Sequence, residues 1–364
     1  MTFGVIGGCG ASGRAVACEL LRSEAGAVLL GGRDRGRLEA VAAELGGRVS
    51  IAPVDVLDAK SLDEFCSRSP VIINCAGPVM LLGDRVAQAA FRARCHYIDP
   101  AGMSVVKEGL ALHEAAIEEA ERSFVISCGW TPGLSELVPA YAHARASTKM
   151  DSIDSVEVYL TDSGEWSENA VRDAVFYLRR TGFPKPGYFR KGVRVPVKLS
   201  QATRKADLGI GIGCRQFSLV SLAELDELGR RLGDCEFSTY SYLSGIRTTA
   251  AALAIGVLPL PESVSIRWMR GIFRRNRLAV AGFIVARVAG KRAGRGGVLQ
   301  CAIVFDAGRD YWIHAQMLAT VARLVAAGKS ATGVHFLTEA LHPLALMAEL
   351  EGAGVEHSEH VEFA

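Results

Sequence analysis

The stretch GVIGGCGASGRAV at residues 4–16 decides the fold of this 364-residue chain. It continues a short apolar run, places four glycines in the seven positions from Gly7 to Gly13, and leads into RAVACELLRSE (14–24), whose apolar residues have helical spacing. A strand, a glycine-rich turn and a helix in this order are typical of a dinucleotide-binding motif. The turn lets a pyrophosphate approach the backbone, and N–H groups at the start of the helix donate hydrogen bonds to its negatively charged oxygens. A plain tight turn is the alternative interpretation.

The next segment, AVLLGGRDRGRLEAVAAEL (27–45), predicts a second strand, a turn and a second helix. An NAD-binding domain carries an acidic residue at the end of this strand, where it binds the ribose hydroxyls. Here Gly31, Gly32 and Arg33 hold that place. An arginine without a carboxylate suits a 2′-phosphate, with Arg14 as a second cation, so we expect NADPH as the cofactor. Alternatively, Arg33 and Arg35 are solvated turn charges.

The rest of the N-terminal third continues the alternation of strands and helices. Apolar runs that end in polar or small residues begin near residues 48, 70, 96 and 122, with helical segments between them. Such alternation predicts a parallel sheet whose ligands bind beyond the carboxyl ends of the strands. The fold class is therefore α/β, with an N-terminal Rossmann domain.

The motifs of this region resemble those of the saccharopine dehydrogenase-like family of NAD(P)-dependent oxidoreductases, in order and in spacing. The matching motifs within residues 3–137 are GGCGASGR, GGRDRGRLEAVA, VDVLD, VIINCAGP, CHYIDPAG and SCGWTPGL. The resemblance implies that the pyrophosphate contacts the glycine turn, that Arg33 lies on the adenosine side, and that three further groups line the cofactor. The residues so implied are Gly7, Gly10, Ala11, Ser12 and Gly13 for the pyrophosphate, Asp55 and Val56 near the adenine, and Asn74, Cys75, Ala76 and Gly77 along the ribose and nicotinamide.

The same resemblance implies an interlaced chain, in which the C-terminal segment returns to complete the Rossmann unit. We therefore expect a Rossmann domain over 1–132, a substrate and dimerisation domain over 133–308, and a returning segment over 309–364. The tail HFLTEALHPLALMAEL is rich in leucine, as packed segments are.

The middle region predicts an α+β domain. Segments 153–162, 213–222, 283–290 and 297–308 alternate like strands of a mixed or antiparallel sheet, and 168–182 and 247–258 have helical patterns. A sheet face or edge in this region suits a homodimer. Residues 265–297 are rich in arginine; they are either a solvated surface or a landing surface for an anionic partner such as a carrier protein.

The fifth predicted strand offers the best candidates for acid–base chemistry. In HYID (96–99), alternation places Tyr97 and Asp99 on one face and His96 on the other. We expect Tyr97 and Asp99 to be catalytic; their alternative roles are a packed core residue and a loop cap. Cys128 and Trp130 suit the wall of the site, and His314 suits a structural role on a helix.

These features predict a reductase that passes hydride from NADPH to an unsaturated bond of a small or carrier-bound substrate. A C=N bond is favoured because CGWTPGL resembles the saccharopine and carboxynorspermidine branches of the family. The alternatives are C=O reduction, a trans-acting enoyl (C=C) reductase on a carrier-bound acyl chain, and a non-catalytic NADP-binding protein.

The composition of the chain excludes several classes of protein. The net charge of +2 argues against a nucleic-acid partner, and no apolar run reaches the about 18 residues of a membrane span. Nine dispersed cysteines without a CxxC pair predict neither a disulfide framework nor a metal site, and the cytoplasm is the expected location.

Overall fold

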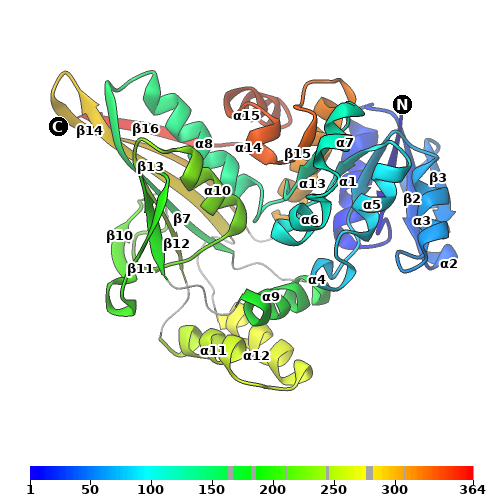
Figure 1. Ribbon diagram of the computed structural model, residues 1–364, viewed down its shortest axis with the longest axis horizontal. Helices are drawn as coiled ribbons and strands as arrows, with labels where there is room; N and C mark the ends of the chain where they lie inside the picture. Colours follow the sequence, from blue (N-terminus) through cyan, green and yellow to red (C-terminus); the bar gives the residue numbers. More distant parts are fainter. Residues whose placement is uncertain are drawn as a thin grey trace. The chain divides into compact units, whose positions relative to one another are not determined.

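The polypeptide forms two units, each assembled from two separate segments of the chain. The computed structural model describes residues 1–162, 167–181, 186–209, 211–242, 246–275, 282–306 and 308–363. Unit 1 comprises Met1–Leu134 and Tyr311–Val355, and unit 2 comprises Ser135–Asp310 and Glu356–Ala364. Figure 1 shows the elements of both units along the chain.

The described part of unit 1 contains a seven-stranded sheet in the order β15-β6-β5-β4-β1-β2-β3, and every strand pairing is parallel. The chain builds outward from β1 in one direction and then resumes with β4 on its other side, so the strand order reverses at β1. Ligands of such sheets bind at this reversal, beyond the carboxyl ends of the strands. The predicted Rossmann architecture is confirmed. The strands are β1 Thr2–Ile6, β2 Ala27–Gly32, β3 Val49–Pro53, β4 Val71–Asn74, β5 His96–Ile98, β6 Ser123–Ile126 and β15 Gly333–Phe336.

Two helices of unit 1, α2 and α3, start at an aspartate whose side chain caps the helix. The side chain of Asp34 accepts a hydrogen bond from Arg37 N at 3.0 Å and starts α2, and that of Asp58 does the same with Lys60 N for α3. Helix α1 begins at Ala11, within the glycine turn, although the apolar pattern predicted a start at Arg14. The helices are α1 Ala11–Arg22, α2 Arg35–Leu45, α3 Ala59–Cys66, α4 Val79–Leu82, α5 Arg85–Arg92, α6 Met103–Leu110, α7 Glu114–Glu119, α13 Asp310–Ala326, α14 Leu337–Ala340 and α15 Pro343–Gly352.

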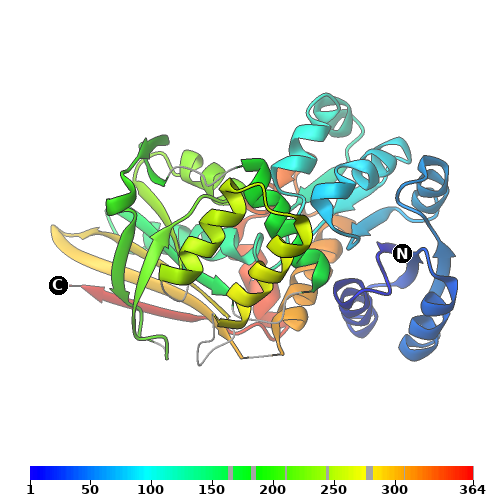
Figure 2. The same ribbon diagram turned by 90° about the horizontal axis from the view of Figure 1, so that it is seen from below.

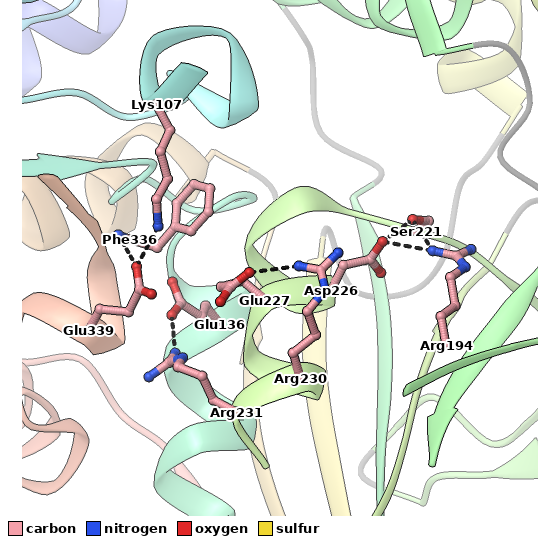
Figure 3. Close-up of polar contacts among 10 residues, drawn as sticks. All are labelled: Lys107, Glu136, Arg194, Ser221, Asp226, Glu227, Arg230, Arg231, Phe336 and Glu339. Atoms are coloured by element: carbon pink, nitrogen blue, oxygen red, sulfur yellow. Dashed lines mark hydrogen bonds and ion pairs between the residues drawn. The ribbon is translucent and has the colours of Figure 1, made fainter. Parts of the chain in front are cut away.

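The returning segment is tied into unit 1 by pairing and by one ion pair. Strand β15 lies parallel to β6 at the edge of the sheet. Glu339 in α14 accepts from Phe336 N at 2.8 Å and from Lys107 Nζ in α6 at 3.0 Å (Figure 3). The Lys107 ammonium also lies 4.5 Å from the centre of the Phe336 ring. The predicted return of the chain to the Rossmann unit is confirmed for Tyr311–Val355.

Unit 2 is built on a mixed sheet in the order β10-β11-β12-β7-β13-β14-β16, with β8 and β9 joined to β12. Within it β12 and β7 are parallel and the other pairings are antiparallel. The strands predicted at 153–162, 213–222, 283–290 and 297–308 are confirmed. The strands are β7 Ser152–Asp162, β8 Gly187–Arg190, β9 Val193–Pro196, β10 Thr203–Asp207, β11 Cys214–Leu219, β12 Glu236–Ser241, β13 Gly282–Arg292, β14 Arg295–Phe305 and β16 Ser358–Phe363.

Three helices of unit 2 form a group with a small core of its own. Helices α9, α11 and α12 lie together in both views (Figures 1 and 2). Their shared apolar cluster consists of Val171, Val175, Ala252, Ile255, Met269 and Ile272. The predicted helices over 168–182 and 247–258 correspond to α9 and α11. The helices of unit 2 are α8 Leu134–Ser147, α9 Glu168–Thr181, the 3₁₀ turn Leu199–Gln201, α10 Ala223–Arg231, α11 Ile246–Val257 and α12 Glu262–Arg275.

The last strand of the chain joins unit 2. Strand β16 pairs antiparallel with β14, and Glu359 accepts from Arg145 Nε of α8 at 2.8 Å and also pairs with Lys149. These cations lower the pKa of Glu359 to about 2. The predicted returning segment, 309–364, therefore contributes to both units, because β16 pairs with the edge of β14 and Glu359 forms ion pairs with Arg145 and Lys149 in unit 2.

The arginine-rich stretch 265–297 does not form one continuous surface element. Its first part lies in α12 and its last part in the β13–β14 hairpin, while residues 276–281 lie outside the described residues. Ala293 and Gly294, with φ of +51° and +79°, form the two-residue turn of the hairpin. Across the described residues, no helix is long and apolar enough to cross a membrane.

Candidate functional site

The glycine turn between β1 and α1 is shaped by backbone contacts that exclude side chains. Gly7 has a φ of +82°, and a Cβ atom there would lie 2.7 Å from the carbonyl carbon of Cys75. A Cβ on Gly13 would meet the Gly7 backbone, 2.8 Å from its carbonyl carbon. Gly7 N and Gly8 N both donate to Gly31 O at 2.9 Å, and Gly10 N donates to Gly7 O at 2.9 Å. The turn is thus locked against β2 and the loop after β4.

The first turn of α1 offers an anion site beside these glycines. Ala11, Ser12 and Gly13 are its first three residues, and Arg14 N is the first to pair within the helix, with Gly10 O at 2.9 Å. N–H groups in a first turn have no intrahelical carbonyl, and the helix dipole favours negative charge there. The arrangement suits the pyrophosphate predicted for these residues.

The predicted adenosine side lies at the carboxyl ends of β2 and β3. Arg33 follows β2 and its side chain is exposed, so its guanidinium is accessible to a phosphate. Val54 N donates to Gly32 O at 3.0 Å, which holds the turn after β3 beside the end of β2. In that turn Asp55 accepts from Leu57 N at 2.9 Å, and Val56 is buried. Arg33, Asp55 and Val56 therefore belong to two adjacent turns, as the sequence predicted for a binding edge.

Arg14 has a partner within the protein. It forms an ion pair with Glu44 of α2, and both side chains are about half exposed. An exposed pair of this kind contributes little to stability and exchanges partners readily. The role of Arg14 toward the 2′-phosphate stays a prediction.

The loop after β4 begins with a buried amide. Asn74 Oδ1 accepts from Ala76 N at 3.1 Å, and its Nδ2 donates to the Tyr97 hydroxyl at 3.2 Å. Cys75 N donates to Ile6 O at 2.8 Å, so the loop lies beside the end of β1. Burial raises the pKa of the Cys75 thiol to about 12, which keeps it protonated. Asn74, Cys75 and Ala76 thus line the strand reversal, where the ribose and nicotinamide were predicted.

Tyr97 and Asp99 lie together at the end of β5, fully buried. Asp99 Oδ1 accepts from Ser127 N at 3.1 Å and from Gly102 N, which joins the loops after β5 and β6. Within the described residues, Asp99 Oδ2 has no hydrogen-bond partner. Burial raises the pKa of Asp99 to about 6, against the opposing effect of its N–H donors and the Tyr97 hydroxyl. Burial and Asp99 raise the pKa of Tyr97 well above its usual range, so Tyr97 stays protonated.

His96 has a different environment from its two neighbours. Its Nδ1 accepts from Ser123 N at 3.1 Å. Burial and the nearby Arg122 lower the pKa of His96, so the ring is neutral near pH 7. The alternation that separated His96 from Tyr97 and Asp99 in the sequence thus corresponds to two chemically different faces of the strand.

His314 is a residue whose position the sequence did not reveal. It lies in α13, and its ring contacts Gly129 in the loop after β6. The sequence signal was one histidine in an apolar helix, which by itself indicates a packed residue. Cys128, which precedes Gly129 in the sequence, donates through Sγ to Asp99 O at 3.1 Å. Burial raises the pKa of that thiol.

Comparison with known proteins shows what this arrangement is similar to. Residues 3–175 match the family model of the saccharopine dehydrogenase NADP-binding domain. A probable mitochondrial saccharopine dehydrogenase-like oxidoreductase of Arabidopsis thaliana is 29% identical over 114 residues, 31% of this chain and 25% of that protein. A lipid droplet localized protein of Caenorhabditis elegans is 26% identical over 174 residues, 46% of this chain and 41% of that protein. The chain thus matches less than half of the length of these two relatives.

Solved structures extend the likeness in fold to the whole chain. Apo saccharopine dehydrogenase (L-Glu forming) from Saccharomyces cerevisiae superposes with a TM-score of 0.65 over 99% of both chains, at 13% identity. A probable dehydrogenase from Thermotoga maritima superposes with a TM-score of 0.52 over 96% of this chain and 94% of that one, at 10% identity. Residues 3–175 therefore match the NADP-binding domain of saccharopine dehydrogenases, and the whole chain has a fold similar to that of saccharopine dehydrogenase.

Proposed function

We propose that this oxidoreductase is an NADPH-dependent imine reductase, acting on a C=N bond of a small or carrier-bound metabolite. The observation that carries the proposal is the Tyr97–Asp99 pair at the end of β5. Asp99 keeps one buried carboxylate oxygen unpartnered among the described residues, and its pKa of about 6 is near neutrality. An acid with such a pKa suits proton transfer to an imine nitrogen at physiological pH.

The residues of the chain then divide the work as follows. Bound NADPH supplies the hydride, and the chain has to hold the acceptor bond and deliver a proton. The first turn of α1 binds the pyrophosphate, and Arg33 binds the 2′-phosphate. Asn74 fixes the Tyr97 hydroxyl, and Asp99 Oδ2 exchanges the proton near the acceptor atom.

A screen of three acceptor classes tests the reaction. Purified protein and NADPH are incubated with cyclic imines, 2-enoyl thioesters and 2-oxo acids, and the absorbance of the reduced nicotinamide is followed. We expect turnover with an imine. Turnover of the thioester alone would favour an enoyl reductase on a carrier-bound chain. Tight NADPH binding without turnover of any class would favour a non-catalytic NADP-binding protein.

The double variant Tyr97→Phe/Asp99→Asn tests the proton source. Because neither residue is among the predicted cofactor contacts, we expect NADPH affinity within a few-fold of wild type and turnover reduced by about 100-fold or more. The matched control is His96→Asn on the same strand, which keeps an acceptor for Ser123 N and should keep turnover. Unchanged turnover of the double variant would exclude both residues from the chemistry; lost NADPH binding would make them cofactor contacts.

Arg33→Ala tests the 2′-phosphate contact. A charge-assisted bond to phosphate is lost, so NADPH binding should weaken by roughly 1.5–3 kcal/mol while NADH binding stays unchanged. Calorimetry with both nucleotides gives the comparison. Arg68→Ala is the control, since Arg68 is exposed and lies between α3 and β4, at the amino end of β4 and not at the carboxyl ends of the strands. Equal loss for both nucleotides would contradict a phosphate contact.

The homodimer and the cytoplasmic location stay predictions. The two relatives are named for mitochondria and for lipid droplets, so the names give the family no single location. The carrier protein proposed as a partner of the arginine-rich stretch would have to meet α12 or the β13–β14 hairpin, which are separate elements.

A further inference from the structure

His314 packs against a position that has no room for a side chain. A Cβ atom on Gly129 would lie 3.0 Å from His314 Cε1 and 3.1 Å from His314 Nδ1. The same atom would lie 2.8 Å from Pro100 O. The imidazole therefore occupies the space that a side chain at position 129 would need.

The ring nitrogen Nε2 of His314 is buried and, among the described residues, makes no hydrogen bond. A buried polar atom without a partner usually reflects a missing ligand or a functional constraint. Burial lowers the pKa of His314 to about 4, so the ring is uncharged at neutral pH. A neutral imidazole offers one N–H donor and one acceptor, and it orients polar groups without itself titrating.

The position of the ring relates it to the binding edge of the sheet. Gly129 N donates to Pro100 O at 3.2 Å, and Cys128 N donates to Asp99 O at 2.9 Å. His314 thus lies at the two loops that follow β5 and β6, the same loops that Asp99 joins. Strand β6 is three places from β1 in the sheet, about 14 Å at the usual strand spacing. This is the side of the site away from the pyrophosphate.

We propose that His314 is a substrate-binding residue, whose Nε2 hydrogen-bonds to a polar atom of the acceptor molecule and orients its unsaturated bond. This inference rests on the function proposed above and adds a residue from the returning segment to that site. Asp99 and Tyr97 supply the proton, and His314 binds the acceptor molecule. A substrate with a carbonyl, carboxylate or imine group next to the reacting carbon provides the polar atom.

The first test needs no substrate. His314→Phe removes both ring nitrogens at similar shape, and a purely structural histidine would lower the melting temperature when lost. A ligand-binding histidine with an unpaired nitrogen costs stability in the free protein. We therefore expect the Tm of the ligand-free protein to stay equal or to rise by about 2–4 °C. A fall of several degrees would overturn the proposal.

The second test separates substrate from cofactor. With whichever acceptor class the screen identifies, we expect His314→Phe to raise KM at least tenfold and to leave NADPH affinity within about twofold. His314→Gln, whose amide nitrogen lies near the place of Nε2, should recover most of the loss. The pH profile of kcat/KM should keep its limb near pH 6 in both variants. A tenfold loss of NADPH affinity would instead make His314 a cofactor contact.

The two proposals fail in different ways. If wild-type protein turns over none of the three acceptor classes, the proposed reductase function fails, whatever the Tm of His314→Phe. If wild type turns over an imine and His314→Phe keeps the same KM, the role of His314 fails and the reductase function stands.

Discussion

Replacing Gly7 with alanine is expected to weaken NADPH binding by about 100-fold or more. The φ of +82° at this position strains any residue with a side chain, and the added Cβ would lie 2.7 Å from the Cys75 carbonyl. The strain and the clash between two backbones together cost about 3 kcal/mol or more, which corresponds to an affinity loss of about 100-fold. Calorimetry with NADPH measures it, and circular dichroism shows whether the fold persists.

Gly10→Ala is the matched control for that variant. Gly10 has a φ of −79°, and a Cβ there would meet only the Gly7 carbonyl oxygen, at 3.2 Å. We expect this change to reduce affinity by much less than Gly7→Ala. Binding of NADPH by Gly7→Ala within threefold of wild type would contradict the backbone argument.

The second large effect is expected in unit 2, where Arg231→Met should destabilise the fold by about 3 kcal/mol. Glu136 of α8 is completely buried, and Arg231 Nη2 of α10 lies 3.1 Å from its Oε1 (Figure 3). Removing the cation takes a charged partner away from a buried carboxylate, which costs more than the pair contributes. Urea unfolding measures the change. The double variant Glu136→Met/Arg231→Met should recover most of the loss; additive losses would contradict this explanation.

Glu224 lies beside this pair and is expected to make the stability of the fold depend on pH, with Glu224→Gln as the control. Ser135 Oγ donates to it at 3.3 Å, and burial with the nearby Glu136 raises its pKa to about 8. The folded protein therefore holds a proton on Glu224 that the unfolded chain releases above about pH 4.5. The stabilisation of the folded protein by this proton is full below that pH and is lost as the pH rises to about 8. Between these two values the free energy of unfolding falls by about 1.4 kcal/mol per pH unit. Glu224→Gln should remove this slope and leave stability near pH 5 almost unchanged.

The sequence predicted those parts of unit 1 that local pattern determines. The apolar runs gave β1 to β6, and the glycine turn together with Arg33 predicted the cofactor that the family confirms. Helix α1 starts earlier than its apolar face, because Ala11 is exposed and Gly13 is buried without a side chain, so neither carries an apolar signal. Local pattern therefore located the elements more reliably than their ends.

Contacts between distant segments explain what the sequence did not predict. Strand β16 carries the sequence SEHVEF, which has no continuous apolar face, and it is a strand because β14 offers an edge and Arg145 and Lys149 hold Glu359. Likewise, His314 is unusual only because α13 brings it against Gly129, almost two hundred residues earlier in the chain. Alternation placed Asp99 next to Tyr97, but the burial that shifts its pKa depends on the loops after β5 and β6.

The interleaved course of the chain has a consequence for synthesis and for recombination. The parallel sheet of unit 1 obtains its edge strand β15 only after residue 336 has been made, and the sheet of unit 2 obtains β16 after residue 363. Unit 1 thus cannot finish folding on the ribosome before residues 135–310 of unit 2 have been translated, and unit 2 obtains its last strand only after all of unit 1 has been made, unlike domains that follow one another in sequence. By the same reasoning, unit 2 of a related protein cannot be grafted by exchanging residues 135–310 alone. The graft has to bring its own C-terminal strand, or β14 is left with an open edge that can pair with other molecules.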